Sequence, residues 1–443
     1  MESILNTLVE QYKDEMYEEL AEFVRFKTLN DRTTAREGAP YGQANRDALD
    51  KLIVLGQELG FEVKDYDGYV ATLTWGKQGK EIGVLAHMDI VPAGDGWNTD
   101  PFDPVIIDGK MFGRGTIDDK GPLLAALYAA KAVMESGLPV SNHIKLIVGC
   151  NEEEGHNCVK YYLTKEKGPD MGFSPDASFG VIHAEKAILR FKIRKEFDQI
   201  DKSGLSVEKI EAGTVVNAVP NCAKVWLKDA TGNVEMKQFD GIPAHAMCPW
   251  VGKNAIIPML DYLRTLDYSD ASVREYFQTV YDLFEDGWEG KNMGIACEDH
   301  LSGKLTMNLG LMKMDDKMAE VEIDIRCPIH SDMKVLIKTV MLTCQSKSLI
   351  TEVSHMCDSL YVPKDAPLVQ KLLGVYNEVT GRDEKPFTIG GGTYCREVEN
   401  VISYGPLFPE EPDLAHQANE YIDLENMLLA AKIYAQAIYE LMK

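Results

Sequence analysis

The sequence lacks any long apolar segment. No stretch comes near the roughly 18 uninterrupted apolar residues that a membrane-spanning helix needs. The first 26 residues, "MESILNTLVEQYKDEMYEELAEFVRF", carry charges throughout and follow the periodicity of an amphipathic helix, unlike a signal peptide. We therefore expect a cytoplasmic protein with no membrane partner.

Basic residues are scarce relative to acidic ones. The 443 residues include 46 Lys and Arg against 70 Asp and Glu, which gives a formal net charge of −24 at pH 7. Nucleic acids and anionic membranes are bound through basic patches, so this balance argues against both kinds of partner. An acidic chain can also contain a pocket that holds cations.

Paired cysteines are missing as well. The nine cysteines are scattered, and no two of them form a CxxC pair. A structural zinc site built from thiolates is therefore not expected. Reduced and mostly buried thiols are the expectation, as in a cytoplasmic protein.

The chain is too long for one hydrophobic core, and its pattern of elements changes twice. A strand "EIGVLAH" (81–87), a helix "GPLLAALYAAKAVMESG" (121–137) and a strand "HIKLIVGC" (143–150) predict a mostly parallel sheet covered by helices. From about residue 186, alternating segments such as "AILRFKIRKEFD" predict hairpins combined with helices. The helix and strand pattern of the first part returns near residue 356.

These changes predict an α/β fold that is interrupted by an insertion. The first domain would be a mixed, mostly parallel sheet flanked by helices, formed by residues 1–185 and 356–443. Residues 186–355 would form an inserted α+β domain. No short-period repeat and no low-complexity segment is present.

Polar clusters fall where the predicted parallel strands end. In an open parallel sheet, ligands gather at the carboxyl ends of the strands. The clusters are "AHMDIVPAGDGW", "GRGTIDDKGP", "NEEEG", "SPDASFG" and, before the last helix, "DLAHQANEY". Together they supply two histidines and several carboxylates but no thiolate, a donor set that suits Zn²⁺, Mn²⁺ or Co²⁺. Two such ions, about 3.5–4 Å apart, would gather the carboxylates of "NEEEG" without net repulsion.

Each cluster by itself has a simpler interpretation. His87 could be a core histidine, Asp176 a turn residue, and the three glutamates an exposed helical face. Asp118 and Asp119 could cap the following helix. The His87-x-Asp89 spacing favours a metal-bound imidazole that a carboxylate orients. The prediction of a metal site therefore depends on the order and context of all five clusters.

The five motifs "HMDIVPAGDGW", "GRGTIDDKGP", "NEEEG", "SPDASF" and "HQANEYI" resemble, in this order, those of the dinuclear metallopeptidases. That family includes aminoacylases, glutamate carboxypeptidases, carnosinases and bacterial dipeptidases. "GWNTDPFDP", "FTIGGGTYCR" and "GPLFPEEPDLAHQANE" look like the PepV-type branch of bacterial dipeptidases. The resemblance spans nearly the whole chain.

The resemblance implies a role for each site residue. His87 and Asp176 would bind one metal, Glu154 and His416 the other, and Asp118 would bridge the two ions. Glu153 would be the general base, Asp89 would orient His87, and Glu152 would have no catalytic role. Two divalent ions per chain are implied, with Zn²⁺ as the first expectation and Mn²⁺ or Co²⁺ as alternatives.

The resemblance also makes the inserted domain a lid that contributes to the site. His245, in "GIPAHAMCPWVGKNAI", would donate to the tetrahedral oxyanion, although it could be an ordinary loop histidine. Asn217 and Arg326 match positions that face substrate, and arginine suits a C-terminal carboxylate; both could instead be buried structural contacts. Gly391, Gly392 and Thr393 could hold the same carboxylate with backbone N–H groups, or form only a tight turn.

The expected activity is that of a dipeptidase acting on small peptides with a free N-terminus. Asp119 is a candidate partner for the substrate amine. A deacylase of N-acyl amino acids or a desuccinylase would reuse every metal residue, and a non-catalytic metal-binding regulatory protein is the alternative from another class. Nucleotide binding at "IGGGTY" is disfavoured because the phosphate-loop spacing is missing. The long insertion resembles a doubled lid that supplies its histidine in cis, so we expect a monomer.

Overall fold

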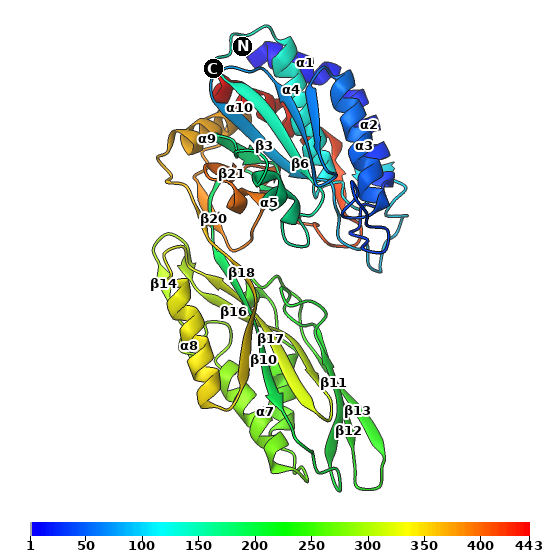
Figure 1. Cartoon of the computed structure of the whole chain (residues 1–443), viewed down its shortest axis with the longest axis vertical. Helices are drawn as coiled ribbons and strands as arrows, with labels where there is room; N and C mark the ends of the chain where they lie inside the picture. The colour runs from blue at the N-terminus through cyan, green and yellow to red at the C-terminus, as the bar shows by residue number, and fades with distance from the viewer. Residues whose placement is uncertain (1) are drawn as a thin grey trace. The chain divides into compact units, whose positions relative to one another are not determined.

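The computed structural model describes residues 2–443 and divides them into two compact units (Figure 1). The first unit contains residues up to His183, Val362–Phe387 and Gly392–Lys443. The second unit contains Ala184–Tyr361 and Thr388–Gly391. Met1, the first residue of the predicted N-terminal helix, lies outside the described residues. Within residues 2–443, no helix combines the length and the apolar character that crossing a bilayer requires.

The first unit contains most of a mixed sheet, whose strands β9, β19 and β20 belong partly or wholly to the second unit. Its strand order is β1-β2-β6-β3-β7-β21-β9-β19, and β20 pairs with β9. The strands are β1 (Glu62–Tyr66), β2 (Val70–Trp75), β3 (Glu81–His87), β6 (His143–Gly149), β7 (Met171–Ser174), β9 (Ile182–Glu185), β19 (Leu360–Tyr361), β20 (Phe387–Ile389) and β21 (Val401–Ser403). The chain passes between the units within or next to β9, β19 and β20. The expectation of a mixed sheet flanked by helices is confirmed.

Small strands complete the first unit. Strands β4 (Val105–Ile107), β5 (Lys110–Phe112) and β23 (Tyr421–Asp423) form one sheet, and β8 (Ala177–Ser178) pairs with β22 (Pro406–Leu407). These pairings tie the C-terminal part of the chain to segments that come some 230 to 310 positions earlier, such as Tyr421 opposite Phe112. Loops that are distant in sequence therefore meet in this unit.

Helices surround this sheet. They are α1 (Glu2–Gln11), α2 (Lys13–Arg25), α3 (Gln43–Glu58), α4 (Lys120–Glu135), α5 (Asn157–Leu163), α9 (Pro367–Thr380) and α10 (Leu424–Met442), with the 3₁₀ helix η2 (Tyr394–Glu397). The Ala-rich α4 and α10 pack against each other and on β3, because their small side chains allow close approach. The single N-terminal helix that we expected is two helices, since a turn at Tyr12 separates α1 from α2.

The parallel part of the sheet brings three loops to one edge. Strand β3 runs parallel to both β6 and β7, and His87 at the end of β3 lies opposite Gly149 at the end of β6. The segments that follow β6 and β7 contain Glu152 and Asp176. Parallel pairing therefore places these side chains beside His87, as the rule for strand ends predicts.

The second unit contains a seven-stranded antiparallel sheet in the order β13-β12-β11-β16-β17-β10-β18. Its strands are β10 (Ala187–Glu196), β11 (Ser206–Ala212), β12 (Cys222–Lys228), β13 (Val234–Asp240), β16 (Thr306–Met314), β17 (Met318–Cys327) and β18 (Ile350–Cys357), with a separate hairpin of β14 (Glu298–Asp299) and β15 (Gly303–Lys304). Helices α6 (Ile256–Leu263), α7 (Ala271–Phe284) and α8 (Met333–Ser346) complete it, with the 3₁₀ helix η1 (Pro249–Val251). Their apolar faces and that of the sheet form one continuous core, which the alternating strand pattern predicts.

Candidate metal centre

His87 is fixed from both sides of its imidazole ring. It is fully buried at the end of β3. Its Nδ1 atom lies 3.0 Å from the backbone carbonyl oxygen of Asp89, and its Nε2 atom lies 3.0 Å from Oδ1 of Asp118. A backbone acceptor at Nδ1 sets the tautomer in which Nε2 can ligate a metal.

Asp118 stands between two imidazoles. Its Oδ1 atom faces Nε2 of His87, and its Oδ2 atom lies 3.1 Å from Nε2 of His416. His416 comes from the loop between β22 and β23, almost 300 positions later in the chain. The two oxygens of one carboxylate therefore point to two different nitrogen donors.

Glu153 contacts the same His416 nitrogen as Asp118. Its Oε2 atom lies 3.0 Å from Nε2 of His416, and a carboxylate oxygen of Glu153 lies within 4.8 Å of the ligand atoms of His87 and Asp118. Glu154 is exposed and belongs to neither of the groups with metal-ligand spacing among the described residues. The structure thus brings Glu153, and not Glu154, to the position that we predicted for the second ligand carboxylate.

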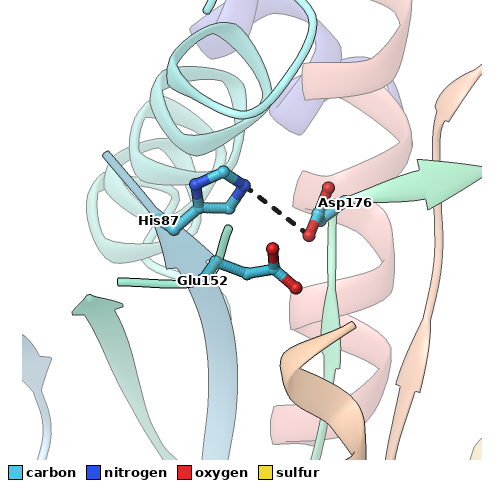
Figure 2. A group of neighbouring side chains, drawn as sticks. All are labelled: His87, Glu152 and Asp176. Atoms are coloured by element: carbon cyan, nitrogen blue, oxygen red, sulfur yellow. Dashed lines mark ion pairs between the residues drawn. The ribbon is translucent and has the colours of Figure 1, made fainter. Parts of the chain in front are cut away.

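Asp176 and Glu152 also lie near His87 (Figure 2). Oδ2 of Asp176 is 3.7 Å from Nε2 of His87. Potential ligand atoms of His87, Glu152 and Asp176 all lie within 4.8 Å of one another. Two groups with metal-ligand spacing therefore share His87. One also contains Glu152 and Asp176, and the other also contains Asp118 and Glu153.

The acids of this cluster cannot all carry charge without compensation. Burial raises the pKa of Asp176 well above its usual value, and the charge of Asp118 adds to the effect although His87 opposes it. Burial and the neighbouring Asp118 raise the pKa of Glu153 to about 8. Partial desolvation lowers the pKa of His416, whose side chain is half-exposed, but its bonds to Asp118 and Glu153 outweigh this and raise that pKa to about 11. Protons thus balance the charge here, and divalent cations would balance it equally well.

Asp89 contacts the glutamate loop as well as His87. Its Oδ1 atom accepts a hydrogen bond from the backbone N–H of Glu152 at 2.9 Å, and its Oδ2 atom accepts one from Glu153 at 3.2 Å. The distance from Oδ1 to Nδ1 of His87 is longer, at 3.5 Å. The fully buried carboxylate of Asp89 therefore fixes the backbone of the loop in addition to flanking the imidazole.

Asp119 points away from solvent. It is fully buried, and its Oδ2 atom accepts a hydrogen bond from the backbone N–H of His87 at 3.1 Å. Burial raises its pKa well above the usual value for aspartate. This environment does not support the predicted contact of Asp119 with a substrate amine.

The predicted substrate residues of the second unit lie on neighbouring segments. Ala218 forms a β-bridge with His245, and the N–H of Ala246 donates to the carbonyl oxygen of Asn217 at 2.8 Å. Nδ1 of His245 accepts a hydrogen bond from the N–H of Met247 at 3.1 Å. The neutral ring then carries its proton on Nε2, which makes that atom a donor.

Arg326 is already bonded within the second unit. Its guanidinium donates to both oxygens of Asp324, at 2.5 and 3.1 Å, and its Nη1 atom donates to the carbonyl oxygen of Gly390 at 2.8 Å. Asp324 also accepts a hydrogen bond from Nε of Arg190 at 2.8 Å. Arg326 thus holds the turn that contains Gly390.

The glycine-rich turn crosses the boundary of the two units. Gly391 is the last residue of the second unit, whereas Gly392 and Thr393 belong to the first. The hydroxyl of Thr393 lies 3.1 Å from that of Ser403 and accepts a hydrogen bond from the N–H of Cys395, so it caps η2. A Cβ atom on Gly392 would come within 2.5 Å of the Arg396 guanidinium, so a larger residue here would displace that side chain.

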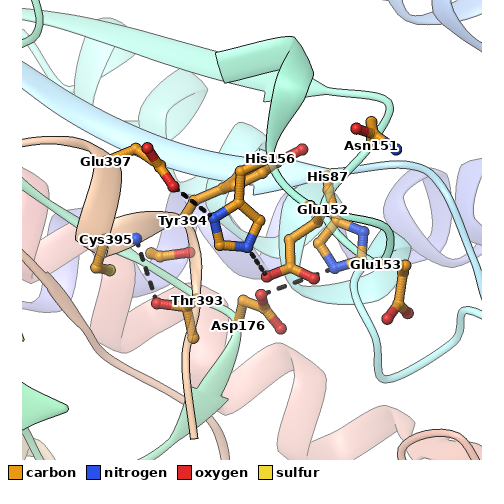
Figure 3. Close-up of polar contacts among 12 residues, drawn as sticks. His87, Asn151, Glu152, Glu153, His156, Asp176, Thr393, Tyr394, Cys395 and Glu397 are labelled. Carbon is orange, nitrogen blue, oxygen red and sulfur yellow. Dashed lines mark hydrogen bonds and ion pairs between the residues drawn. The ribbon is translucent and has the colours of Figure 1, made fainter. Parts of the chain in front are cut away.

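Sequence reasoning missed two ion-pair networks beside the cluster. His156 lies between Glu152 and Glu397 (Figure 3). Arg114 forms a fully buried ion pair with Glu420, at 2.6 Å. Arg114 and Glu420 lie inside the "GRGTIDDKGP" and "HQANEYI" motifs, and His156 follows "NEEEG" directly, but nothing in the linear sequence indicates these pairings.

Comparison with known proteins identifies the family of this chain. Residues 83–440 match the family model of peptidase family M20/M25/M40. "Putative dipeptidase YtjP" of Bacillus subtilis (strain 168) is 37% identical over 460 residues, covering 97% of this chain and 98% of the relative. "Putative dipeptidase SH1171" of Staphylococcus haemolyticus (strain JCSC1435) is 32% identical over 461 residues and covers 98% of both chains.

Solved structures share the fold. Human carnosine dipeptidase 1 superimposes with a TM-score of 0.66 at 16% identity and covers 100% of this chain and 98% of its own. The dipeptidase Dug1p of Saccharomyces cerevisiae gives a TM-score of 0.67 at 16% identity, with 99% and 98% covered. At such identities these matches show the fold, whereas the sequence matches show the family. The chain belongs to peptidase family M20/M25/M40 and is a hydrolase of the metallopeptidase class.

Proposed function

We propose that this protein is a dipeptidase that hydrolyses dipeptides with a free N-terminus at a site for two divalent metal ions. The single observation that carries the proposal is Asp118, whose two carboxylate oxygens face the Nε2 atoms of His87 and His416 at 3.0 and 3.1 Å. A carboxylate placed in this way is suited to bridge two cations. The names of the relatives from Bacillus and Staphylococcus support dipeptides as the substrate class.

The donor atoms fit two divalent ions. His87 and Asp176 would hold one ion and Glu153 and His416 the other, with Asp118 shared between them. Imidazole nitrogens and carboxylate oxygens suit Zn²⁺, with Mn²⁺ and Co²⁺ as alternatives. We assign Glu153, in place of the sequence-predicted Glu154, as the ligand because of its contact with His416.

We assign Glu152, in place of the sequence-predicted Glu153, as the general base. Its carboxylate lies near the ligand atoms of His87 and Asp176, and its Oε1 atom is 3.1 Å from Nε2 of His156. His156 belongs to neither of the groups with metal-ligand spacing among the described residues, and a carboxylate that such a residue orients is suited to proton transfer. When bound, the two ions would acidify a water molecule and stabilise the negative charge that develops on the amide oxygen.

The residues of the chain then move the protons. Glu152 accepts a proton from the water molecule as the water oxygen bonds to the amide carbon. Glu152 delivers that proton to the leaving nitrogen as the carbon–nitrogen bond breaks, which gives two amino acids. Asp89 holds the backbone N–H groups of Glu152 and Glu153 and so keeps both side chains in position.

Asn217, His245 and Arg326 remain proposed substrate contacts. The donor at Nε2 of His245 supports its proposed role toward the oxyanion. Gly391 and Gly392 remain candidates for backbone contacts with the substrate carboxylate, whereas the Thr393 hydroxyl already has partners. The second unit as a lid, a monomeric state and a cytoplasmic location remain proposals from the sequence.

The decisive experiment combines metal removal with a substrate panel. The chain is stripped with a chelator, reloaded with Zn²⁺, Mn²⁺ or Co²⁺, and assayed on alanyl-leucine, N-acetyl-alanyl-leucine and N-acetyl-leucine. We expect no turnover without metal, restored turnover of alanyl-leucine, and little hydrolysis of either acetylated compound. Preferential hydrolysis of N-acetyl-leucine would make the protein a deacylase, and no hydrolysis of any compound by the metal-loaded chain would contradict the proposal.

A further inference from the structure

His156 is a histidine between two glutamates. Its Nε2 atom lies 3.1 Å from Oε1 of Glu152, and its Nδ1 atom lies 3.0 Å from Oε1 of Glu397 (Figure 3). Both partners are carboxylates, which only accept hydrogen bonds when ionised, so the ring donates from both nitrogens. Such charge-assisted bonds are shorter and stronger than neutral ones and fix the direction of the Glu152 carboxylate.

The surrounding structure holds His156 itself in place. Its N–H donates to the carbonyl oxygen of Asn151 at 2.9 Å, and its carbonyl oxygen accepts from the N–H of Lys160, so His156 is the N-cap residue of α5. Its backbone has a φ of 63°, in the left-handed region that non-glycine residues rarely adopt. The ring of the fully buried Tyr394 packs edge-on against the imidazole, with centroids 5.2 Å apart.

Glu397 connects this histidine to the C-terminal segment of the first unit. It is the last residue of η2, and its Oε1 atom also lies 3.4 Å from Nζ of Lys160. His156 thus connects a carboxylate from the segment after β6 with one from η2, about 240 positions apart. His156 is absent from both groups with metal-ligand spacing among the described residues, so its contacts serve Glu152 and not a metal ion.

We propose that His156, oriented by Glu397, is a positioning residue that aims the Glu152 carboxylate at the attacking water molecule. The inference rests on the proposed function, because it takes Glu152 as the general base. A carboxylate side chain can rotate about three bonds, and small misplacements of a catalytic group cost up to about 10²-fold in rate. The hydrogen bond from His156 to Glu152 removes that freedom, because Glu397 holds the His156 ring in place.

The test is a double-mutant cycle on alanyl-leucine hydrolysis. The variants are His156→Leu, the conservative His156→Gln, Glu397→Gln, Glu152→Gln, and Glu152→Gln combined with His156→Leu. We expect His156→Leu to lower kcat by about 10- to 100-fold with KM within about twofold. His156→Gln and Glu397→Gln should lower kcat less, since each keeps part of the hydrogen bonding.

The combined variant separates positioning from general structural damage. Glu152→Gln alone should lower kcat by about 10²- to 10⁴-fold. If His156 acts through Glu152, adding His156→Leu to Glu152→Gln should change kcat by less than about twofold. Equal fold-losses from His156→Leu in both backgrounds would overturn the inference, and so would an unchanged kcat in His156→Leu.

Two further measurements keep the outcome interpretable. The bound zinc per chain should be the same in wild type and His156→Leu, and loss of zinc would overturn the inference by making His156 a ligand or a support of the ligands. His143→Leu is the matched control, because His143 also pairs with a glutamate, Glu81, but at the opposite end of β6. It should leave kcat unchanged.

Failure of the proposed function would be visible separately. Wild-type protein that hydrolyses no dipeptide would contradict that function, whereas full activity of Glu152→Gln in a protein that hydrolyses dipeptides would overturn the choice of base and this inference but not the function. Independently of the kinetics, a crystal structure of His156→Leu tests the positioning. A Glu152 carboxylate with unchanged orientation in that variant would overturn the inference.

Discussion

The carboxylate of Asp89 holds the backbone of Glu152, its Oδ1 atom accepting the amide hydrogen bond at 2.9 Å. The same residue offers its carbonyl oxygen to Nδ1 of His87, so it fixes residues at the ends of β3 and β6 together. Aspartate in the H-x-D motif thus positions two segments of the candidate metal centre. This dual role makes Asp89 the first residue to test.

We expect Asp89→Asn to lower both kcat and the affinity for zinc by about 10- to 100-fold, as for other residues that orient metal ligands. An amide has one acceptor oxygen, so one of the N–H groups of Glu152 and Glu153 would face an amide donor. Steady-state kinetics and zinc titration measure the effect. Asp95→Asn, an exposed position in the same loop, is the control and should behave as wild type.

Glu153 and Glu154 should behave differently. We expect Glu153→Ala to lose most of the zinc that the wild type retains in dialysis, because Glu153 contacts His416 and lies beside Asp118. Glu154→Ala should retain both metal and activity, since Glu154 is exposed and outside the two groups. Metal loss in Glu154→Ala with full retention in Glu153→Ala would restore the assignment made from the sequence.

Metal binding should compete with protons. Without metal the pKa of His416 lies at about 11, so the ring is protonated at any pH below that value, whereas a free imidazole loses its proton near pH 6.5. A metal ion takes the neutral imidazole, and binding therefore displaces the proton. We expect the zinc affinity to rise with pH between 6.5 and 8.5, by up to about tenfold per unit for each proton displaced.

Calorimetry in two buffers with different ionisation enthalpies counts the protons that zinc releases. His416→Ala should release fewer protons than wild type, because it lacks the ring that must lose one. A zinc dissociation constant independent of pH over this range would show that His416 is not a protonated ligand. The same pKa predicts an effect on stability in the absence of metal. The contribution of His416 to the free energy of unfolding is complete below about pH 6.5 and is lost as the pH rises through 11.

Glu420→Ala should destabilise the first unit. Glu420 is fully buried, pairs with Arg114, and accepts hydrogen bonds from the N–H groups of Gly115 and Ile117 at 2.9 and 3.0 Å. Removing it leaves a buried guanidinium without its charge partner, which costs about 3–5 kcal/mol in the free energy of unfolding. Urea unfolding measures this loss. Glu378→Ala, exposed on α9, should change the free energy of unfolding by less than about 0.5 kcal/mol.

The sequence was sufficient for the architecture and for the chemical type of the site. Short apolar runs end at His87 and just before Glu152, and parallel pairing brings such ends to one edge of the sheet. The alternating segments after residue 186 predicted the antiparallel sheet of the second unit, because one face of each strand is buried. Histidine and carboxylate motifs without thiolates indicated a metal site of oxygen and nitrogen donors.

Only the tertiary structure decided which glutamate of "NEEEG" faces which partner. The sequence gives no basis for assigning different roles to three adjacent glutamates, although neighbouring side chains point in different directions. The choice depends on His416 and Asp89, which come from segments up to about 260 positions away in the chain, and on His156, which Glu397 holds in place. Likewise, the sequence offered Asp119 as a candidate partner for the substrate amine, whereas its burial and its hydrogen bond from the N–H of His87 follow from packing.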